Sequence, residues 1–163
     1  MAGTALDQTE FRNALACFAS GVTIVTTIDG SGRPNGFTAS AFSSLSLDPP
    51  LVLVCLEKRA NSYDAFMQAD KMAISVLAED QLDLGLRFAR KDIDKFEGLN
   101  AKAGEATGLP LIDGATVHLE CRMYERLAGG DHTILVGEVL RAKVTDRPPL
   151  IHFNRTFGRF VQA

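Results

Sequence analysis

The sequence lacks tryptophan, and it lacks any apolar run of the roughly 18 residues that a membrane-spanning helix needs. Cysteine and histidine are also scarce, with three of each. They stand at Cys17, Cys55, Cys121, His118, His132 and His152. No C-x-x-C pair occurs and the spacings fit no metal site, so we predict no bound metal. Cys55 and Cys121 lie within apolar runs, which predicts buried thiols.

A strong charge of one sign is absent as well. The formal net charge is -3 and the basic residues are scattered, so nucleic-acid binding is not expected. The first residues contain neither the basic region nor the apolar stretch of a secretory leader. We therefore predict a cytoplasmic protein without a membrane partner. With 163 residues, 46% of them hydrophobic, residues 1–163 should form one domain with a sizeable core.

Several signatures of self-contained chemistry are missing. No G-x-G-x-x-G follows a predicted strand, no G-x-x-x-x-G-K-[ST] is present, and no G-x-S-x-G occurs. These absences argue against a Rossmann dinucleotide site, a P-loop and an α/β-hydrolase nucleophile. An enzyme with this sequence should obtain its reactivity from a bound group.

Residues 36–56 are the most informative stretch that is present. Six small or hydroxylated residues stand at positions 38–41, 43 and 44, Pro49 and Pro50 interrupt the chain, and an unbroken apolar run occupies 51–56. A strand with one edge against a flat, polar ligand would use both features. The alternative is a half-exposed strand whose Thr and Ser side chains face water.

The remaining pattern predicts mostly strands. Asp7 and Glu10 have the spacing of a capping box, and apolar residues follow at helical spacing to residue 18. The expected helices cover residues 8–19, about 61–69 and 79–90. The expected strands cover 22–28, 36–44, 51–56, 72–78, 115–127 and 132–144, with a last short segment at 150–158. Residues 91–114 read as a long loop that could carry function. Because most connections are too short for parallel crossovers, we predict a mainly β, antiparallel barrel with a few short helices.

Four sequence blocks, in this order, resemble the short-chain flavin reductase family. They are residues 11–14 through 18–27, residues 36–52, residues 88–89 followed by 94–96, and residues 130–132 together with 149–153. The resemblance implies the FMN-binding split β-barrel, an antiparallel, Greek-key-like fold. His152 stands where a Tyr is common in the family, and residues 154–156 also depart from its usual pattern. These departures bear on nicotinamide contacts more than on flavin contacts.

The resemblance also implies an activity. Such proteins use NADH or NADPH to reduce FMN or FAD, and the reduced flavin passes to a partner flavin-dependent monooxygenase. They are usually homodimers with flavin near the subunit interface. One alternative keeps the flavin bound and reduces another acceptor, such as a corrinoid. Another is a non-catalytic flavin carrier or sensor, for which the Gly130-Asp131-His132 motif would have no evident purpose.

The family's flavin contacts map onto three groups of residues. The ring would lie against Thr38, Ala39 and Ser40, and Ser43 and Ser44 either extend this contact or serve the turn before Pro49. The phosphate would lie where a buried strand ends and a helix begins. That region comprises Cys55, Leu56, Lys58, Ala60, Asn61 and Ser62. Plain N-capping by Asn61 or Ser62 is the alternative.

Further contacts are implied downstream. Phe88, Ala89 and Arg90 would lie against the flavin, although Phe88 could equally be a core residue. Lys95 and Phe96 match the family's loop lid. His132 would orient the nicotinamide or stabilise reduced flavin without being indispensable, the alternative being a strand-end histidine bonded to backbone. Phe153, Arg155 and Phe157 could border the same cleft, with packing as the alternative for the two phenylalanines.

Overall fold

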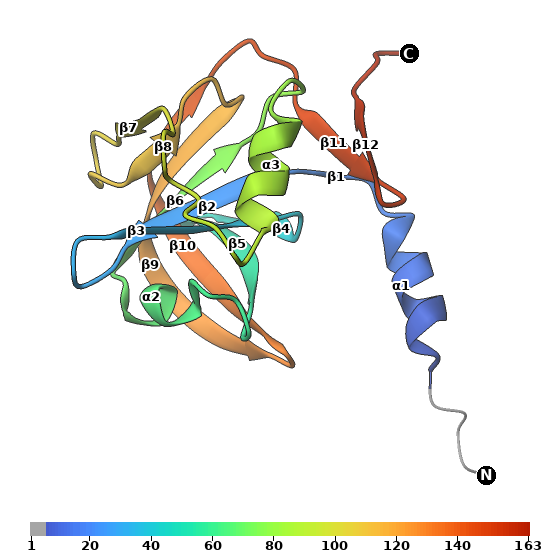
Figure 1. Cartoon of the computed structure of the whole chain (residues 1–163), viewed down its shortest axis with the longest axis horizontal. Helices are drawn as coiled ribbons and strands as arrows, with labels where there is room; N and C mark the ends of the chain where they lie inside the picture. The colour runs from blue at the N-terminus through green and yellow to red at the C-terminus, as the bar shows by residue number, and fades with distance from the viewer. Residues whose placement is uncertain (1–5) are drawn as a thin grey trace.

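The computed structural model describes residues 6–163, and the strands dominate it (Figure 1). The start of the chain, on which the prediction of no secretory leader depends, lies partly outside the described residues. The helices are α1 (Gln8–Ala16), α2 (Tyr63–Gln68) and α3 (Leu82–Ala89). The strands are β1 (Ser20–Gly21), β2 (Thr23–Ile28), β3 (Pro34–Ala39), β4 (Phe42–Leu47), β5 (Pro50–Glu57), β6 (Lys71–Val76), β7 (Ala101–Ala103), β8 (Pro110–Ile112), β9 (Val117–Gly129), β10 (His132–Val144), β11 (Leu150–Phe153) and β12 (Thr156–Arg159).

A seven-stranded antiparallel sheet forms the body, in the order β3-β2-β6-β9-β10-β5-β4. The long β9–β10 hairpin lies at its centre and has two register shifts, between Val136 and Gly137 and between Val139 and Arg141. Such irregularities bend a sheet and increase its twist. The curvature matters because β3 and β5, which are not neighbours in the sheet, line one cavity. The predicted mainly β, antiparallel architecture is confirmed.

The core lies inside this curved sheet. Val25, Val54, Ile74 and Leu135 come from four different strands and are fully buried. Helix α2 covers one end through Phe66, whose ring meets Phe37 edge-on at a centroid distance of 5.1 Å. Burial of apolar surface of this kind is the main source of stability.

The two cysteines expected to be buried differ. Cys121 is fully buried, and burial, with a smaller contribution from Glu120, raises its pKa to about 12. Cys55 is only partly buried, because it faces the cavity at the end of β5 rather than the core. The prediction of a buried thiol is therefore confirmed for Cys121 and corrected for Cys55.

Helix α3 packs across β3, and glycine at position 36 makes this possible (Figure 1). A Cβ on Gly36 would stand 2.8 Å from Cε1 of the buried Phe88 and 3.0 Å from the Val25 carbonyl oxygen. The Thr38 hydroxyl donates to the Gly85 carbonyl at 2.6 Å and ties the helix to the same strand. Phe96 meets Phe88 edge-on at 5.1 Å, so the loop after α3 folds back over it.

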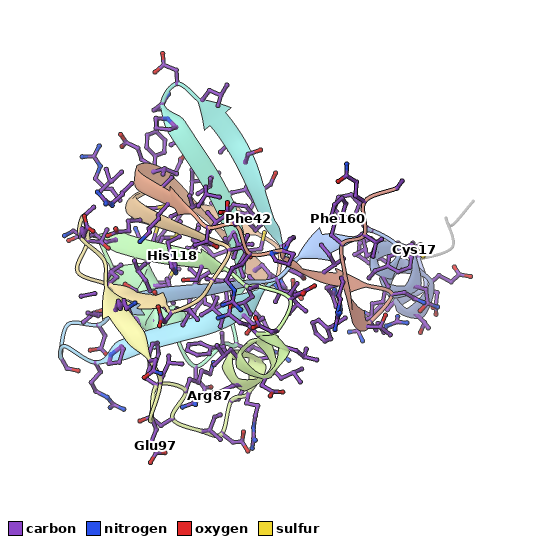
Figure 2. All side chains as sticks on the ribbon, turned by 90° about the horizontal axis from the view of Figure 1, so that it is seen from above. Cys17, Phe42, Arg87, Glu97, His118 and Phe160 are labelled. Atoms are coloured by element: carbon purple, nitrogen blue, oxygen red, sulfur yellow. The ribbon has the colours of Figure 1, made fainter. Side chains whose placement is uncertain are left out.

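The N-terminal helix starts as predicted but lies apart from the body. The Asp7 carboxylate accepts from the backbone N–H groups of Thr9 and Glu10 at 2.8 and 3.0 Å. The helix ends at Ala16 rather than at residue 19, and none of its residues is buried. We call α1, β1, β11 and β12 the protruding module. Figure 2 shows Cys17 and Phe160 in it, well away from the sheet.

The protruding module is held together by its own contacts. Strand β1 pairs with β11, and the Asn154 N–H donates to the Ala16 carbonyl at 2.7 Å. The Arg155 guanidinium donates to the Asn13 side chain at 2.6 Å. The predicted last segment is thus a hairpin, with positive φ angles at Asn154 and Arg155 in its turn.

Three other predicted elements need correction. The strand expected at 36–44 is two strands, since the chain turns at residues 40–41 and β4 pairs back onto β5. The helix expected from residue 79 begins at Leu82, and the expected loop 91–114 contains the β7–β8 hairpin. Small and hydroxylated residues carry no periodicity, so the first break had no local signal. None of the helices among residues 6–163 combines the length and the apolar character that crossing a membrane requires.

Candidate functional site

Four elements and two loops converge on a cavity of about 240 Å³, which we call the inner cavity. Strand β3 contributes one wall, the end of β5 a second, and the last turn of α3 a third, while β10, the turn before α2 and the loop after α3 close the rim. Nine of the residues predicted to contact the cofactor line it. They are Thr38, Cys55, Leu56, Ala60, Asn61, Phe88, Ala89, Lys95 and His132.

Small side chains keep the inner cavity open. Ala60 and Ala89 line it with methyl groups, and Cys55 lines it from β5 with a half-buried thiol. Desolvation raises the pKa of the Cys55 thiol, so this side chain stays neutral. Thr38 lines the same space, but its hydroxyl proton is committed to the Gly85 carbonyl. Small, uncharged side chains therefore line one part of the cavity, while Glu57, Lys91 and Lys95 bring charged groups to another part.

A second, more polar depression of about 430 Å³ adjoins the first, and we call it the outer groove. Asn61, Lys91 and Lys95 line both, so the two spaces meet at these residues. Lys95 Nζ donates to the Gly36 carbonyl at 3.0 Å. Desolvation, and secondarily the charge of Lys91, lowers the pKa of Lys95. A partly desolvated ammonium group is a favourable partner for an anion.

Ser62 lies next to Asn61 and lines the outer groove. The residue is 4% exposed, and its hydroxyl has no hydrogen-bond partner among residues 6–163. It is the N-cap residue of α2 by position, yet the hydroxyl makes no capping bond. The sequence-based alternative of plain side-chain capping by Ser62 is therefore wrong. A buried hydroxyl without a partner is costly, which points to a ligand that would complete it.

Asn61 does not cap the helix either. Its side-chain amide donates to the Lys91 carbonyl and so fastens the loop after α3 to the start of α2. This contact holds the two walls of the junction together.

His132 stands at the rim with its neighbour Asp131. Its Nδ1 lies 2.7 Å from a carboxylate oxygen of Asp131, and this hydrogen bond is the main cause of the lowered pKa of Asp131. With Asp131 ionised, Nδ1–H donates, and Nε2 remains free to face a ligand. Lys58 belongs to the same turn, since its Nζ donates to the Gly130 carbonyl at 2.6 Å. Lys58 thus braces the β9–β10 turn and lies outside the inner cavity.

Several predicted contact residues lie elsewhere in the chain. Ala39 is buried at the end of β3, and Ser40 follows it in the turn. Ser43 and Ser44 are exposed on the edge strand β4, and Arg90 pairs with Asp92 on the surface. Phe153, Arg155 and Phe157 belong to the protruding module, and Ser62 and Phe96 line the outer groove. Ligand contact by these residues stays a prediction.

Sequence reasoning missed two cations near the junction. Lys91 lines both spaces and pairs with Glu57 at 3.3 Å, and Arg33 lines the outer groove. The charged run after residue 89 contained a signal for Lys91, because Lys95 in that run was predicted. Arg33 lies in a turn far away in the sequence, and nothing local connected it with the site.

Known proteins resemble this chain over nearly its whole length. Residues 15–160 match the family described as flavin reductase like domain. The actinorhodin polyketide dimerase of Streptomyces coelicolor is 44% identical, over 98% of this chain and 90% of its own. The FMN reductase (NADH) SmoA of Agrobacterium fabrum is 45% identical, over 92% of this chain and 84% of its own.

A solved structure agrees in fold. The NADH:FAD oxidoreductase of Streptomyces globisporus, in complex with NAD and FAD fragments, superposes with a TM-score of 0.89. It is 38% identical, and the match covers 97% of this chain and 98% of that one. Further relatives are named as reductase components of monooxygenases. The sequence match and the shared fold together show that this chain belongs to the flavin reductase family.

Proposed function

We propose that this chain is an NAD(P)H-dependent reductase of FMN or FAD that supplies reduced flavin to a flavin-dependent monooxygenase. The observation that carries the proposal is the inner cavity, where small uncharged side chains at Thr38, Cys55, Ala60 and Ala89 leave room for a ring. It meets the outer groove at the partly desolvated Lys95, and the groove is also lined by Ser62, whose hydroxyl has no partner among the described residues. The relatives named as flavin or FMN reductases support the activity. Relatives named as reductase components support a monooxygenase partner.

The residues present fit a flavin. Thr38, Ala60 and Ala89 would flank the ring, and the small side chains at 60 and 89 let it approach the backbone. Ser62 and Lys95 would hold the phosphate, since the one lacks a partner and the other carries a partly desolvated charge. When bound, the flavin supplies the redox chemistry by accepting a hydride from the nicotinamide. The protein's contribution is to align the two rings and exclude water.

The decisive experiment is anaerobic mixing of the protein and flavin with NADH and, separately, NADPH, while the flavin absorbance is followed. Fast bleaching of added FMN or FAD is the expected result. A yellow protein that neither nucleotide bleaches would favour a carrier or sensor. Flavin that bleaches while bound but is never released would favour a reductase of another acceptor.

His132 is proposed to orient the nicotinamide from the rim of the inner cavity. The Asp131 carboxylate fixes its ring, and hydride movement between two aligned rings needs no proton at the transfer itself. A His132→Gln variant should therefore keep maximal turnover within about tenfold and mainly raise the KM for NADH, whereas general acid–base catalysis contributes about 100-fold or more. Steady-state kinetics with FMN would measure both quantities, and a selective collapse of kcat would contradict the orienting role.

The protruding module is proposed to join two copies of the chain. Phe11 and Leu15 are 48% and 57% exposed on α1, and Phe18, just after the helix, is 78% exposed. Phe153 and Phe160 are also exposed on this module. Large apolar side chains left exposed together on one module are typical of an interface. We expect a homodimer by light scattering, and a Phe18→Asp variant should become monomeric because it places a charge in that interface.

A matched control for this variant is Leu127→Asp, which changes an exposed leucine on β9 instead. It should leave the native mass unchanged. A wild-type protein that is monomeric at micromolar concentration, or a Phe18→Asp protein that stays dimeric, would contradict the dimer. A single domain over residues 1–163 and a cytoplasmic location remain predictions.

A further inference from the structure

We infer that the outer groove receives the adenylate half of FAD, so that this chain prefers FAD to FMN. The inference rests on the proposed function, because it extends the ligand that the inner cavity would hold. It goes further by naming which of the two flavins the site is built for and which residue makes the distinction.

The inner cavity and the outer groove are continuous. The inner cavity of about 240 Å³ is below the roughly 300–1,000 Å³ of sites that enclose a whole ligand of cofactor size. The outer groove adds about 430 Å³ beyond the junction formed by Asn61, Lys91 and Lys95. A flavin whose first phosphate lies at Ser62 and Lys95 would leave most of the outer groove empty if it ended there.

Arg33 supplies a positive charge beyond the site that we propose for the first phosphate. It lies in the β2–β3 turn and lines the outer groove but not the inner cavity. Among residues 6–163 its guanidinium forms no ion pair, whereas Lys91 is already paired with Glu57. A guanidinium group suits bidentate binding of a phosphate. FAD carries a second phosphate and FMN does not.

Two carboxylates, Asp29 and Asp94, line the groove against three cations, Arg33, Lys91 and Lys95, so three positive and two negative charges leave its lining positive by one. The Asp29 carboxylate is turned inward onto its own loop, where it accepts from Ser31, the Arg33 N–H and the Asn35 amide. These bonds, led by that of the Ser31 hydroxyl, lower the pKa of Asp29 to about 2. Asp94 likewise accepts from the Phe96 N–H at 2.9 Å. Both carboxylates are thus occupied in shaping the loops that flank the groove.

Apolar surfaces are available for the base. Pro34, the first residue of β3, and Ile93, in the loop after α3, both line the groove. A flat adenine ring between a proline and an isoleucine would bury apolar area on both faces. Beyond the proposed phosphate sites, the groove therefore offers both polar and apolar side chains. A nucleoside, with its polar sugar and flat base, can use both.

The adenylate diphosphate of NADH has the same chemistry and could also enter this groove. The position of the groove favours FAD as the source of the adenylate, because the groove continues from the proposed flavin phosphate site. His132, which is proposed to face the nicotinamide, lines the inner cavity and not the outer groove. The test below separates the two sources by measuring flavin binding without any nicotinamide nucleotide.

The test is titration of the purified protein with FAD, FMN and riboflavin, followed by quenching of flavin fluorescence. FAD should bind about tenfold more tightly than FMN. Arg33→Ala should weaken FAD binding by about tenfold and so remove the preference, because the second phosphate loses a charge-assisted pair of hydrogen bonds. Arg141→Ala, a matched loss of one guanidinium on β10, should leave the ratio of the two dissociation constants unchanged.

Equal affinities for FAD and FMN in the wild-type protein would overturn the inference, and so would an Arg33→Ala variant that keeps the preference. If Arg33→Ala instead raises the KM for NADH with either flavin and leaves FAD binding intact, the groove serves the nicotinamide nucleotide and the inference is wrong. Failure of the proposed function gives a different result, namely no binding of any flavin, including riboflavin.

Discussion

An Ala89→Trp variant should lose flavin binding by about 100-fold while its melting temperature stays within a few degrees of the wild-type value. Ala89 ends α3 and lines the inner cavity, and its side chain is exposed. An indole there would occupy much of a space of about 240 Å³. Because the side chain points into the cavity and not into the core, the added volume should not lower the free energy of unfolding.

The measurement is fluorescence titration with FMN and FAD, together with thermal unfolding in the absence of flavin. Ala142→Trp is the matched control, because it puts the same side chain at an exposed position on β10 that does not line the cavity. Its flavin affinity should match the wild type. Unchanged affinity in a folded Ala89→Trp protein would remove the inner cavity from consideration as the flavin site.

Lys95→Met should weaken binding of FMN and FAD by about tenfold to 100-fold and change riboflavin affinity by less than about twofold. Methionine keeps the length and apolar contacts of the lysine stem but removes the cation. Riboflavin has no phosphate, so it reports whether the ring site itself is intact. Lys143→Met, at an exposed position on β10, is the control and should bind all three flavins as the wild type does.

The same lysine predicts a pH dependence with a definite sign. Burial lowers the pKa of Lys95, with a smaller contribution from the charge of Lys91. The protonated form binds the phosphate, so affinity for FMN is present below this pKa and falls as the pH rises through it, below the usual range for lysine. Riboflavin affinity should not share that fall. A parallel loss for riboflavin would show that the titrating group is not the phosphate partner.

Local sequence was a sound guide to some parts of the site. The stretch of small and hydroxylated residues predicted a strand against a ligand, and Thr38 does line the cavity. Cys55 and Ala60 followed from the same resemblance and also line it. Their residue types are unusual for a buried strand or for the start of a helix. The residue type and its position in the chain therefore both indicate contact with a ligand.

Other parts depend on contacts between distant residues. Arg33 and Ser62 lie in separate turns and meet at one groove only because β3 folds next to the start of α2. Serine is a favourable N-cap residue, so its identity gave no sign that the Ser62 hydroxyl would lack a partner within residues 6–163. Likewise the apolar stripe of α1 predicted an amphipathic helix correctly, yet no pattern within the helix says whether its own body or another chain covers it.

By itself, the sequence determined the strand-rich, antiparallel character and the cap at Asp7, because each follows from residues close together in the chain. Tertiary structure alone decided that β3 and β5 share a cavity, that Lys91 and Arg33 stand at its extension, and that the protruding module leaves its aromatic side chains uncovered. The physical reason is that sheet curvature and long-range pairing set these distances, and neither is encoded in any short window of residues.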